Sequence, residues 1–77
     1  MARIPAYKQM YISLKTDIKE GRYVPGSFLP TEPEMEAKYG VSRTTVRRAI
    51  GMLEQEGYLS VTQGRGTEVQ DISTSQH

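Results

Sequence analysis

Three arginines and several hydroxyl groups gather within residues 42–50, where the sequence reads Ser-Arg-Thr-Thr-Val-Arg-Arg-Ala-Ile. No acidic residue interrupts this segment, so its guanidinium groups have no neutralising partner inside it. A guanidinium group donates hydrogen bonds in a planar fork that matches a phosphate, or the O6 and N7 atoms of guanine. The concentration of positive charge therefore predicts an anion-binding surface suited to nucleic acid.

The arginines of this segment, Arg43, Arg47 and Arg48, are candidate contacts to bases or phosphates. The alternative interpretation is a solvated helix face with local ion pairs, which contributes little beyond solubility. Glu54 is the acid that could pair within the same helix, but it lies more than one turn beyond Arg48. The spacing of residues leaves open which arginine reads a base and which contacts a phosphate.

The hydroxyl residues at the start of the segment have two interpretations as well. Ser42 has the residue type of a helix N-cap, and it is also a candidate DNA contact. Thr44 is expected to point outward and to reach a phosphate or a base. Thr45 lies nearer the buried side, so a structural role is as plausible for it. Exposed amides at a helix start provide a further anion site.

The arginines require a rigid element to present them, and the spacing of apolar residues predicts a helix over residues 42–56. An apolar stripe recurs at i, i+3, i+4 and i+7, which is typical of one helix face packed on a core: Val46, Ala49, Ile50 and Leu53. Arg48 falls nearly opposite that stripe. Gly51 costs about 1 kcal/mol relative to alanine in a helix, and it could permit close approach of the backbone to DNA.

Two further helices precede this one. Residues 6–20 repeat apolar positions at a spacing of four, three and four: Tyr7, Tyr11, Leu14 and Ile18. Thr31 and Glu34 form a capping box that begins a second helix, over residues 32–39. Gly40 then ends it in the left-handed conformation. Because only about three residues connect the second and third helices, they must cross steeply as a helix-turn-helix.

The sequence after residue 57 predicts a β-hairpin. Residues 58–62 favour a strand, residues 63–66 form the glycine-rich tip Gln-Gly-Arg-Gly, and residues 67–69 return. Gly64 and Gly66 are candidate backbone contacts to DNA, or no more than turn residues. Arg65 at the tip could enter a minor groove, where the negative potential is strong. A hairpin this small must pack against the helices to be stable.

Composition limits the other function classes. The chain has 77 residues, no cysteine and a net charge of +1, so it can form one small domain without disulfides. It contains no signal peptide or membrane-length apolar run, which favours a cytoplasmic location and no membrane partner. No nucleophile, base and orienting group recur together, and neither metal ligands nor a phosphate loop occur. We therefore expect no enzyme activity, no metal and no cofactor.

Several segments in order carry a resemblance to a known family: Leu29-Pro30-Thr31-Glu32, then Tyr39-Gly40-Val41-Ser42-Arg43-Thr44-Thr45-Val46-Arg47-Arg48-Ala49-Ile50, then Leu53-Glu54 with Gly57-Tyr58-Leu59, and Gly64 with Gly66-Thr67. Together they resemble the DNA-binding domain of the GntR family of bacterial transcription regulators, over roughly residues 4–70. The pair Arg47-Arg48 and the Pro-Thr-Glu-Pro-Glu start of the second helix resemble its HutC-type branch.

The resemblance implies a winged helix-turn-helix, mostly α with a two- or three-stranded antiparallel wing, over residues 1–70. It implies sequence-specific binding of double-stranded DNA, with helix 42–56 in the major groove and wing 58–69 in the minor groove. It further implies a metabolite-responsive repressor, homodimeric on a two-fold symmetric operator in the bacterial nucleoid. A small-molecule effector would bind a C-terminal domain that these 77 residues lack, with residues 71–77 as a disordered tail or linker. The fragment alone would be a monomer or a weak dimer.

Two other functions are compatible with the sequence. The sequence also departs from the family pattern at three positions. The fold could serve as a protein-interaction module, or as the DNA-binding head of an aminotransferase-like regulator. Pro33 stands where many members carry a DNA-contacting arginine, which leaves backbone amides and the Thr31 hydroxyl as contacts from the second helix. Glu36 replaces a usual alanine and adds repulsion toward a phosphate strand. Glu68 replaces a common aromatic residue in the wing.

Overall fold

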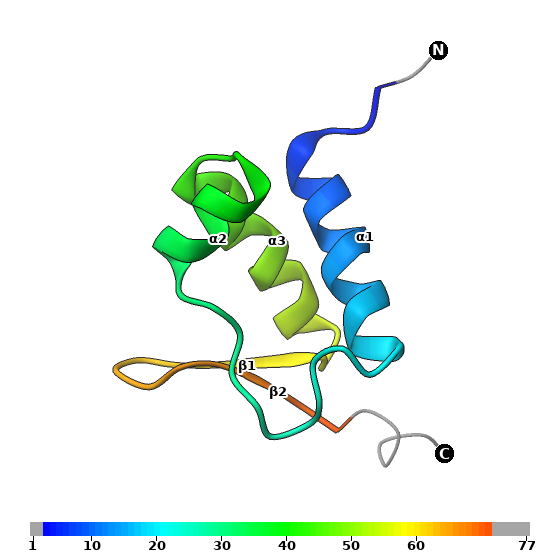
Figure 1. The fold of residues 1–77 in the computed structure, drawn as a ribbon, viewed down its shortest axis with the longest axis vertical. Helices are drawn as coiled ribbons and strands as arrows, with labels where there is room; N and C mark the ends of the chain where they lie inside the picture. The colour runs from blue at the N-terminus through cyan, green and yellow to red at the C-terminus, as the bar shows by residue number, and fades with distance from the viewer. Residues whose placement is uncertain (1–2, 72–77) are drawn as a thin grey trace.

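The computed structural model describes residues 3–71, which form three helices followed by a β-hairpin (Figure 1). The helices are α1 (Ala6–Lys19), α2 (Glu32–Tyr39) and α3 (Arg43–Gln55), and the strands are β1 (Leu59–Thr62) and β2 (Gly66–Val69). This order confirms the predicted fold class. No helix within the described residues is long and apolar enough to cross a membrane. The expected tail beyond Asp71 lies outside the described residues.

The helix-turn-helix follows from local signals in the sequence. The Thr31 hydroxyl accepts a hydrogen bond from the Glu34 amide at 3.3 Å, and the Glu34 carboxylate accepts one from the Thr31 amide at 2.8 Å. Gly40 ends α2 with a φ of 66°, which a side chain would oppose. Ser42 then caps α3 by accepting from the Thr45 amide at 3.2 Å. The predicted capping box, left-handed glycine and serine cap are all confirmed.

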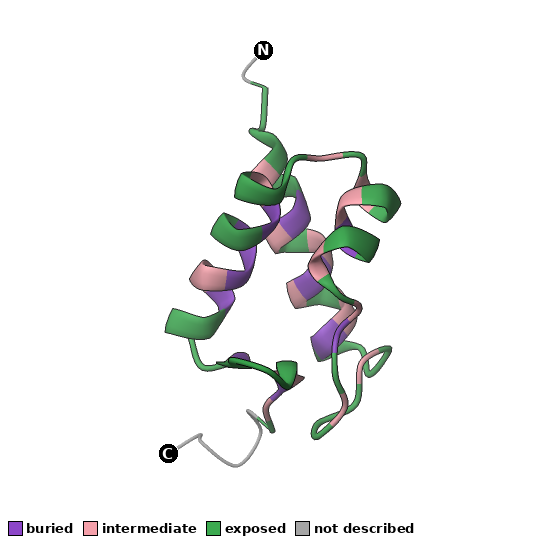
Figure 2. Cartoon of the chain, turned by 90° about the vertical axis from the view of Figure 1, so that its left-hand side faces the viewer, coloured by how far each residue is buried: buried purple, intermediate pink, exposed green. Residues whose placement is uncertain are grey.

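The core forms where α3 meets α1, α2 and the hairpin. All four residues of the α3 stripe are buried, as predicted: Val46, Ala49, Ile50 and Leu53. They pack with Leu14 of α1, Met35 of α2, and Leu59 and Val69 of the hairpin in one hydrophobic cluster. Figure 2 shows buried segments on the side of α1 that faces the other helices. The rotation of α3 about its own axis is therefore fixed by the core.

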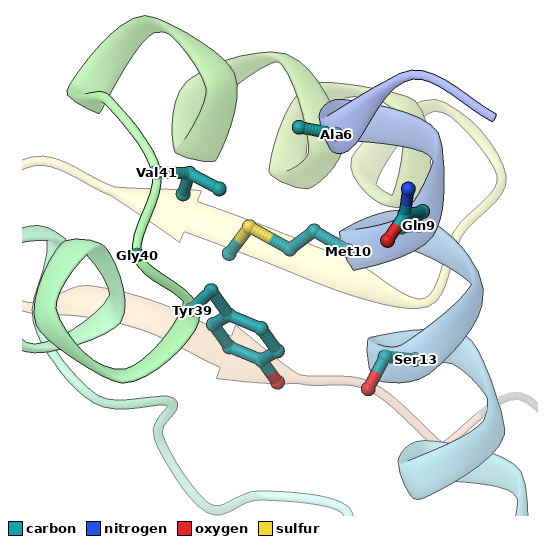
Figure 3. A pocket seen from close by; sticks show the side chains of 7 residues that line it. All are labelled: Ala6, Gln9, Met10, Ser13, Tyr39, Gly40 and Val41. Atoms are coloured by element: carbon teal, nitrogen blue, oxygen red, sulfur yellow. The ribbon is translucent and has the colours of Figure 1, made fainter. Parts of the chain in front are cut away.

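The core side of α1 differs in part from the prediction. The buried residues are Met10, Leu14 and Ile18, spaced at exactly four residues, whereas Tyr7 and Tyr11 are half-buried at the edges. Met10 points from α1 toward the turn between α2 and α3, beside Tyr39 (Figure 3). The long unbranched side chain of methionine reaches this gap more easily than a tyrosine ring with a polar hydroxyl. The apolar repeat predicted Tyr7 and Tyr11 on the core side of the helix; Tyr11 packs against the core at its edge, whereas Tyr7 does not belong to the core cluster.

The hairpin is held on two sides. Its strands pair antiparallel, with Leu59 opposite Val69 and Thr62 opposite Gly66. On the outer edge of β2, the Leu29 amide donates to the Thr67 carbonyl at 2.9 Å, and the Val69 amide donates to the Ser27 carbonyl at 2.8 Å. A single bridge at Phe28 thus takes the place of a third strand. Leu59 and Val69 anchor the hairpin in the core, as its small size requires.

A polar cluster fastens α1 to the end of α3. The Tyr11 hydroxyl donates to the Glu56 carboxylate at 2.6 Å, and the Lys15 ammonium lies 3.3 Å from the same carboxylate. The Lys15 ammonium also lies 5.3 Å from the centroids of the Tyr11 and Tyr58 rings. Hydrogen bonds with Tyr11 and then Glu56 raise the pKa of Lys15 to about 12. The hydrogen bond from Tyr11 lowers the pKa of Glu56 below its ordinary 4.5.

We expect this cluster to make folding more sensitive to acid. Because the pKa of Glu56 is lowered in the folded chain, its contribution is present above about pH 4.5 and is lost as the pH falls through the folded value. Glu56→Gln should therefore lose less stability than the parent between pH 5 and pH 3, measured by urea unfolding. Glu54→Gln is the matched control, since Glu54 is exposed and should keep the parent's acid sensitivity. Equal acid sensitivity in E56Q and the parent would contradict the assignment.

Candidate nucleic-acid interface

The buried stripe of α3 determines which residues this helix presents to solvent. Arg43, Thr44, Arg47 and Arg48 are all exposed, and no acidic residue of α3 lies among them. The first acid of α3 is Glu54, near the C-terminal end of the helix. The structure thus places the predicted arginines on the outer surface of a rigid helix, and none of them is turned inward.

Two of these arginines nevertheless meet carboxylates from α2. The Arg43 Nε atom lies 3.4 Å from a Glu36 oxygen, and the Arg47 Nε atom lies 3.1 Å from a Glu32 oxygen. The prediction that the segment has no acidic partner within itself is confirmed, and both carboxylates come from α2 instead. Glu54, considered as a partner from the sequence, forms no ion pair with any arginine in the described part of the chain.

These ion pairs leave the guanidinium groups available to a ligand. The Arg43 and Arg47 side chains are 61% and 64% exposed, and only their Nε atoms bond the carboxylates. Exposed pairs of this kind contribute about 0–1 kcal/mol to stability. A phosphate or a guanine can therefore replace or join the carboxylate at little cost to the fold.

Arg48 has a different neighbour. Its guanidinium carbon lies 4.0 Å from the centroid of the Tyr7 ring on α1, and it forms no ion pair within residues 3–71. The sequence assigned Tyr7 to the core, so this contact was missed. The only indication of this contact in the sequence is that Tyr7 lies at one end of the apolar repeat of residues 6–20.

The hydroxyl residues fall into two groups. Ser42, Thr45 and Thr31 take part in helix caps: the Ser42 hydroxyl donates to the Thr45 hydroxyl at 3.1 Å, and Thr31 belongs to the capping box of α2. Their structural roles are thus established by contacts, and any contact with DNA would be additional. Thr44 is exposed, and its side chain has no hydrogen-bond partner in the described residues. It is the freest of the four hydroxyls.

The tip of the hairpin contains the remaining predicted residues. Gly64 and Gly66 have φ angles of 87° and 112°, so the turn itself requires glycine at both positions. A Cβ atom on Gly66 would also lie 3.5 Å from the Phe28 ring. Arg65 is exposed, and its guanidinium carbon lies 5.5 Å from the centroid of that ring. The Phe28 ring therefore lies against the tip at Arg65 and Gly66, a contact that the sequence did not predict.

Two grooves bring the separate elements together. One runs from the start of α2, at Thr31 and Glu32, to the hairpin tip at Gly64–Gly66. The other lies between α3 and the hairpin, and Arg47, Gly51 and Val61 contribute to its lining. The hairpin extends past the first turn of α2 beside these grooves (Figure 1). Of the predicted residues, Thr31, Gly64, Arg65 and Gly66 line the first groove and Arg47 lines the second, and the two grooves share Glu32 and Val61.

Three helices with a helix-turn-helix and a supporting hairpin define a winged helix-turn-helix domain. The hairpin is its wing, and α3 occupies the position of the recognition helix in such a domain.

Comparison with known proteins places the chain in a family. Residues 6–69 match the sequence profile described as "Bacterial regulatory proteins, gntR family", and the chain belongs to this GntR family. It is 52% identical over 65 residues to an uncharacterized HTH-type transcriptional regulator, YurK, of Bacillus subtilis, a match covering 84% of this chain and 27% of YurK. It is 47% identical over 66 residues to the HTH-type transcriptional repressor NagR of the same organism, covering 86% of this chain and 27% of NagR.

Solved structures support the same assignment. The DNA-binding domain of AraR, in complex with the operator ORX1, is 40% identical with a TM-score of 0.85, and the match covers 87% of this chain and 81% of that one. A GntR family transcriptional regulator from Listeria monocytogenes is 30% identical with a TM-score of 0.84, covering 91% of this chain and 61% of that one. The chain spans about a quarter of the length of its curated relatives. It is part of a family of regulatory proteins rather than enzymes.

The exposure of the Arg47–Glu32 pair predicts that Arg47 contributes little to folding. Arg47→Ala should lower the free energy of unfolding by less than about 1 kcal/mol in a urea titration. Leu53→Ala in the buried stripe is the reference, with an expected loss of about 2–5 kcal/mol. A loss for R47A as large as that for L53A would mean that Arg47 is a structural residue.

Proposed function

We propose that this chain binds double-stranded DNA in a sequence-specific manner as the operator-reading domain of a transcription regulator. The observation that carries the proposal is the division of α3 into a wholly buried aliphatic stripe and an exposed face bearing three arginines. A helix of this width fits the major groove, which presents a distinct donor and acceptor pattern for each base pair. The DNA-binding domain of AraR, 40% identical to this chain, forms a complex with the operator ORX1, which supports the binding of operator DNA by this chain.

The proposal assigns a role to each part of the surface. Arg43 and Arg47 reach guanine edges or nearby phosphates from α3, and Thr44 contacts a base or a phosphate beside them. Arg65 enters the adjacent minor groove from the wing tip, because the hairpin projects beside α3. Arg48 contacts a phosphate. The backbone at Gly64 and Gly66 and the capping hydroxyls of Thr31, Ser42 and Thr45 add shorter-range contacts.

The larger protein is part of the same proposal. We infer that residues 1–70 are the DNA-binding domain and that residues 71–77 lead to a C-terminal domain binding a small effector, as in the HutC-type branch. The full-length protein would be a homodimeric, cytoplasmic repressor on a two-fold symmetric operator in the nucleoid. Half-sites would then lie on one side of the duplex, with spacing set by the dimer. The present chain would be monomeric or weakly dimeric and would bind DNA correspondingly more weakly.

Selection from a random duplex pool, followed by sequencing of the bound fraction, tests the readers directly. The parent should enrich one motif, and Arg43→Ala or Arg47→Ala should abolish the enrichment, since a guanidinium fork on guanine discriminates bases by about 1–3 kcal/mol. Arg65→Ala should keep the motif but bind more weakly, with a salt slope smaller by about one phosphate equivalent.

Arg22→Ala is the matched control, because Arg22 lies outside the proposed surface and pairs with Asp17 and Glu20. It should select the parent motif with parent affinity. If R43A, R47A and R65A all select the parent motif, the assignment of readers is wrong. Binding that survives high salt without any enriched motif would instead indicate a protein-interaction module.

Gly51 provides a second test of where DNA approaches α3. An added Cβ atom would meet no atom within 4 Å apart from its chain neighbours and the backbone of α3 itself, so the fold does not require glycine in this helix interior. Gly51→Ala should therefore raise the free energy of unfolding by about 1 kcal/mol, measured in urea. It should also weaken binding to the selected duplex, because the methyl group would occupy space between α3 and the bases. A variant that is both more stable and fully active would place the DNA farther from Gly51.

A further inference from the structure

We infer that Tyr7 is a positioning residue for DNA binding: its ring holds the Arg48 guanidinium, still fully charged, at the α1 edge of the recognition helix. The inference rests on the proposed function and adds to it a residue from α1. The contact joins α1 to α3, two helices to which the sequence alone gave separate roles.

The three arginines of α3 have different kinds of neighbour. Arg43 and Arg47 each have a carboxylate beside them, which neutralises part of their charge in the free protein. Arg48 lies 4.0 Å from the centroid of an aromatic ring instead. The face of an aromatic ring attracts a cation through its quadrupole. It leaves the N–H donors, which lie in the plane of the guanidinium group, free to bind another acceptor. The ring therefore limits the motion of Arg48 while leaving its charge and its donors for a phosphate.

The two kinds of neighbour also come from different helices packed against α3. Arg43 and Arg47 lean toward α2, where their glutamates are, whereas Arg48 leans toward α1, where Tyr7 is. A helix in the major groove has one phosphate strand on each side, and the groove is about 12 Å wide. From the α1 side, Arg48 is placed to meet a different phosphate from those approached from the α2 side. Phosphate contacts from both sides would fix the register of α3 in the groove.

The environment of Tyr7 does not account for it as a core residue. Tyr7 is only half-buried, and α1 fills the core with Met10, Leu14 and Ile18. Its hydroxyl forms no hydrogen bond within residues 3–71. What the ring does in the structure is support the Arg48 guanidinium. A phenylalanine could do the same, whereas an aliphatic residue could not.

This difference provides the experiment, which uses the 77-residue chain and a labelled random-sequence duplex at several salt concentrations. Tyr7→Leu should weaken binding about two- to fivefold, the equivalent of one exposed cation–ring contact. Tyr7→Phe should bind like the parent. Arg48→Ala should weaken binding further and lower the salt slope by about 0.9, the value for one phosphate.

A double variant separates positioning from folding. In the R48A background, Tyr7→Leu should cause no additional loss, because the ring then has no guanidinium to hold. An equal loss in both backgrounds, or parent-like binding by Y7L, would overturn the inference and leave the proposed function intact. If the parent shows no salt-dependent binding at all, the proposed function fails and the inference with it. Urea unfolding of each variant identifies any loss that comes from a destabilised fold.

Discussion

The burial of one side of α3 is the constraint on which the rest of the structure depends. Val46, Ala49 and Leu53 have no exposed surface, and Ile50 has almost none, so α3 cannot rotate without exposing the centre of the core. Because a helix turns about 100° per residue, fixing this stripe fixes the direction of every other side chain on α3. The arginines face outward as a geometric consequence of where the aliphatic residues lie.

Local charge, rather than net charge, governs what this surface can bind. The chain carries only one net positive charge, and two α3 arginines already have glutamate neighbours from α2. Those pairs are exposed and contribute little, so they weaken the attraction of the surface for anions without abolishing it. A regulator needs its nonspecific affinity kept low, since the genome offers a vast excess of competing sites. Partial neutralisation of the arginines by Glu32 and Glu36 acts in that direction.

Local signals in the sequence were sufficient for the elements and insufficient for the contacts between them. The Thr31–Glu34 capping box, the left-handed Gly40 and the Ser42 cap involve neighbours within four residues, so the residue types determine them. The partners of the arginines are farther away: Glu32 lies 15 residues from Arg47, and Tyr7 lies 41 positions before Arg48. Such pairs depend on how the helices pack, and periodicity along one helix contains no information about that. Met10 is a different case: it lies four residues before Leu14, so the spacing along α1 was compatible with a core position, but the apolar repeat was assigned to Tyr7 and Tyr11 instead.

In the wing, the residues that hold the hairpin in place are different from the residue that the tip exposes, Arg65. Backbone hydrogen bonds to Ser27 and Leu29 and the buried Val69 hold β2 in place, and none of them involves the residues at the tip. The positive φ angles of Gly64 and Gly66 then determine the shape of the turn around Arg65. The backbone shape of the turn is therefore determined by the two glycines rather than by the side chain at position 65. Substitutions of exposed side chains on α3 and at the tip can therefore change what this surface binds, because the core that positions them is unaffected.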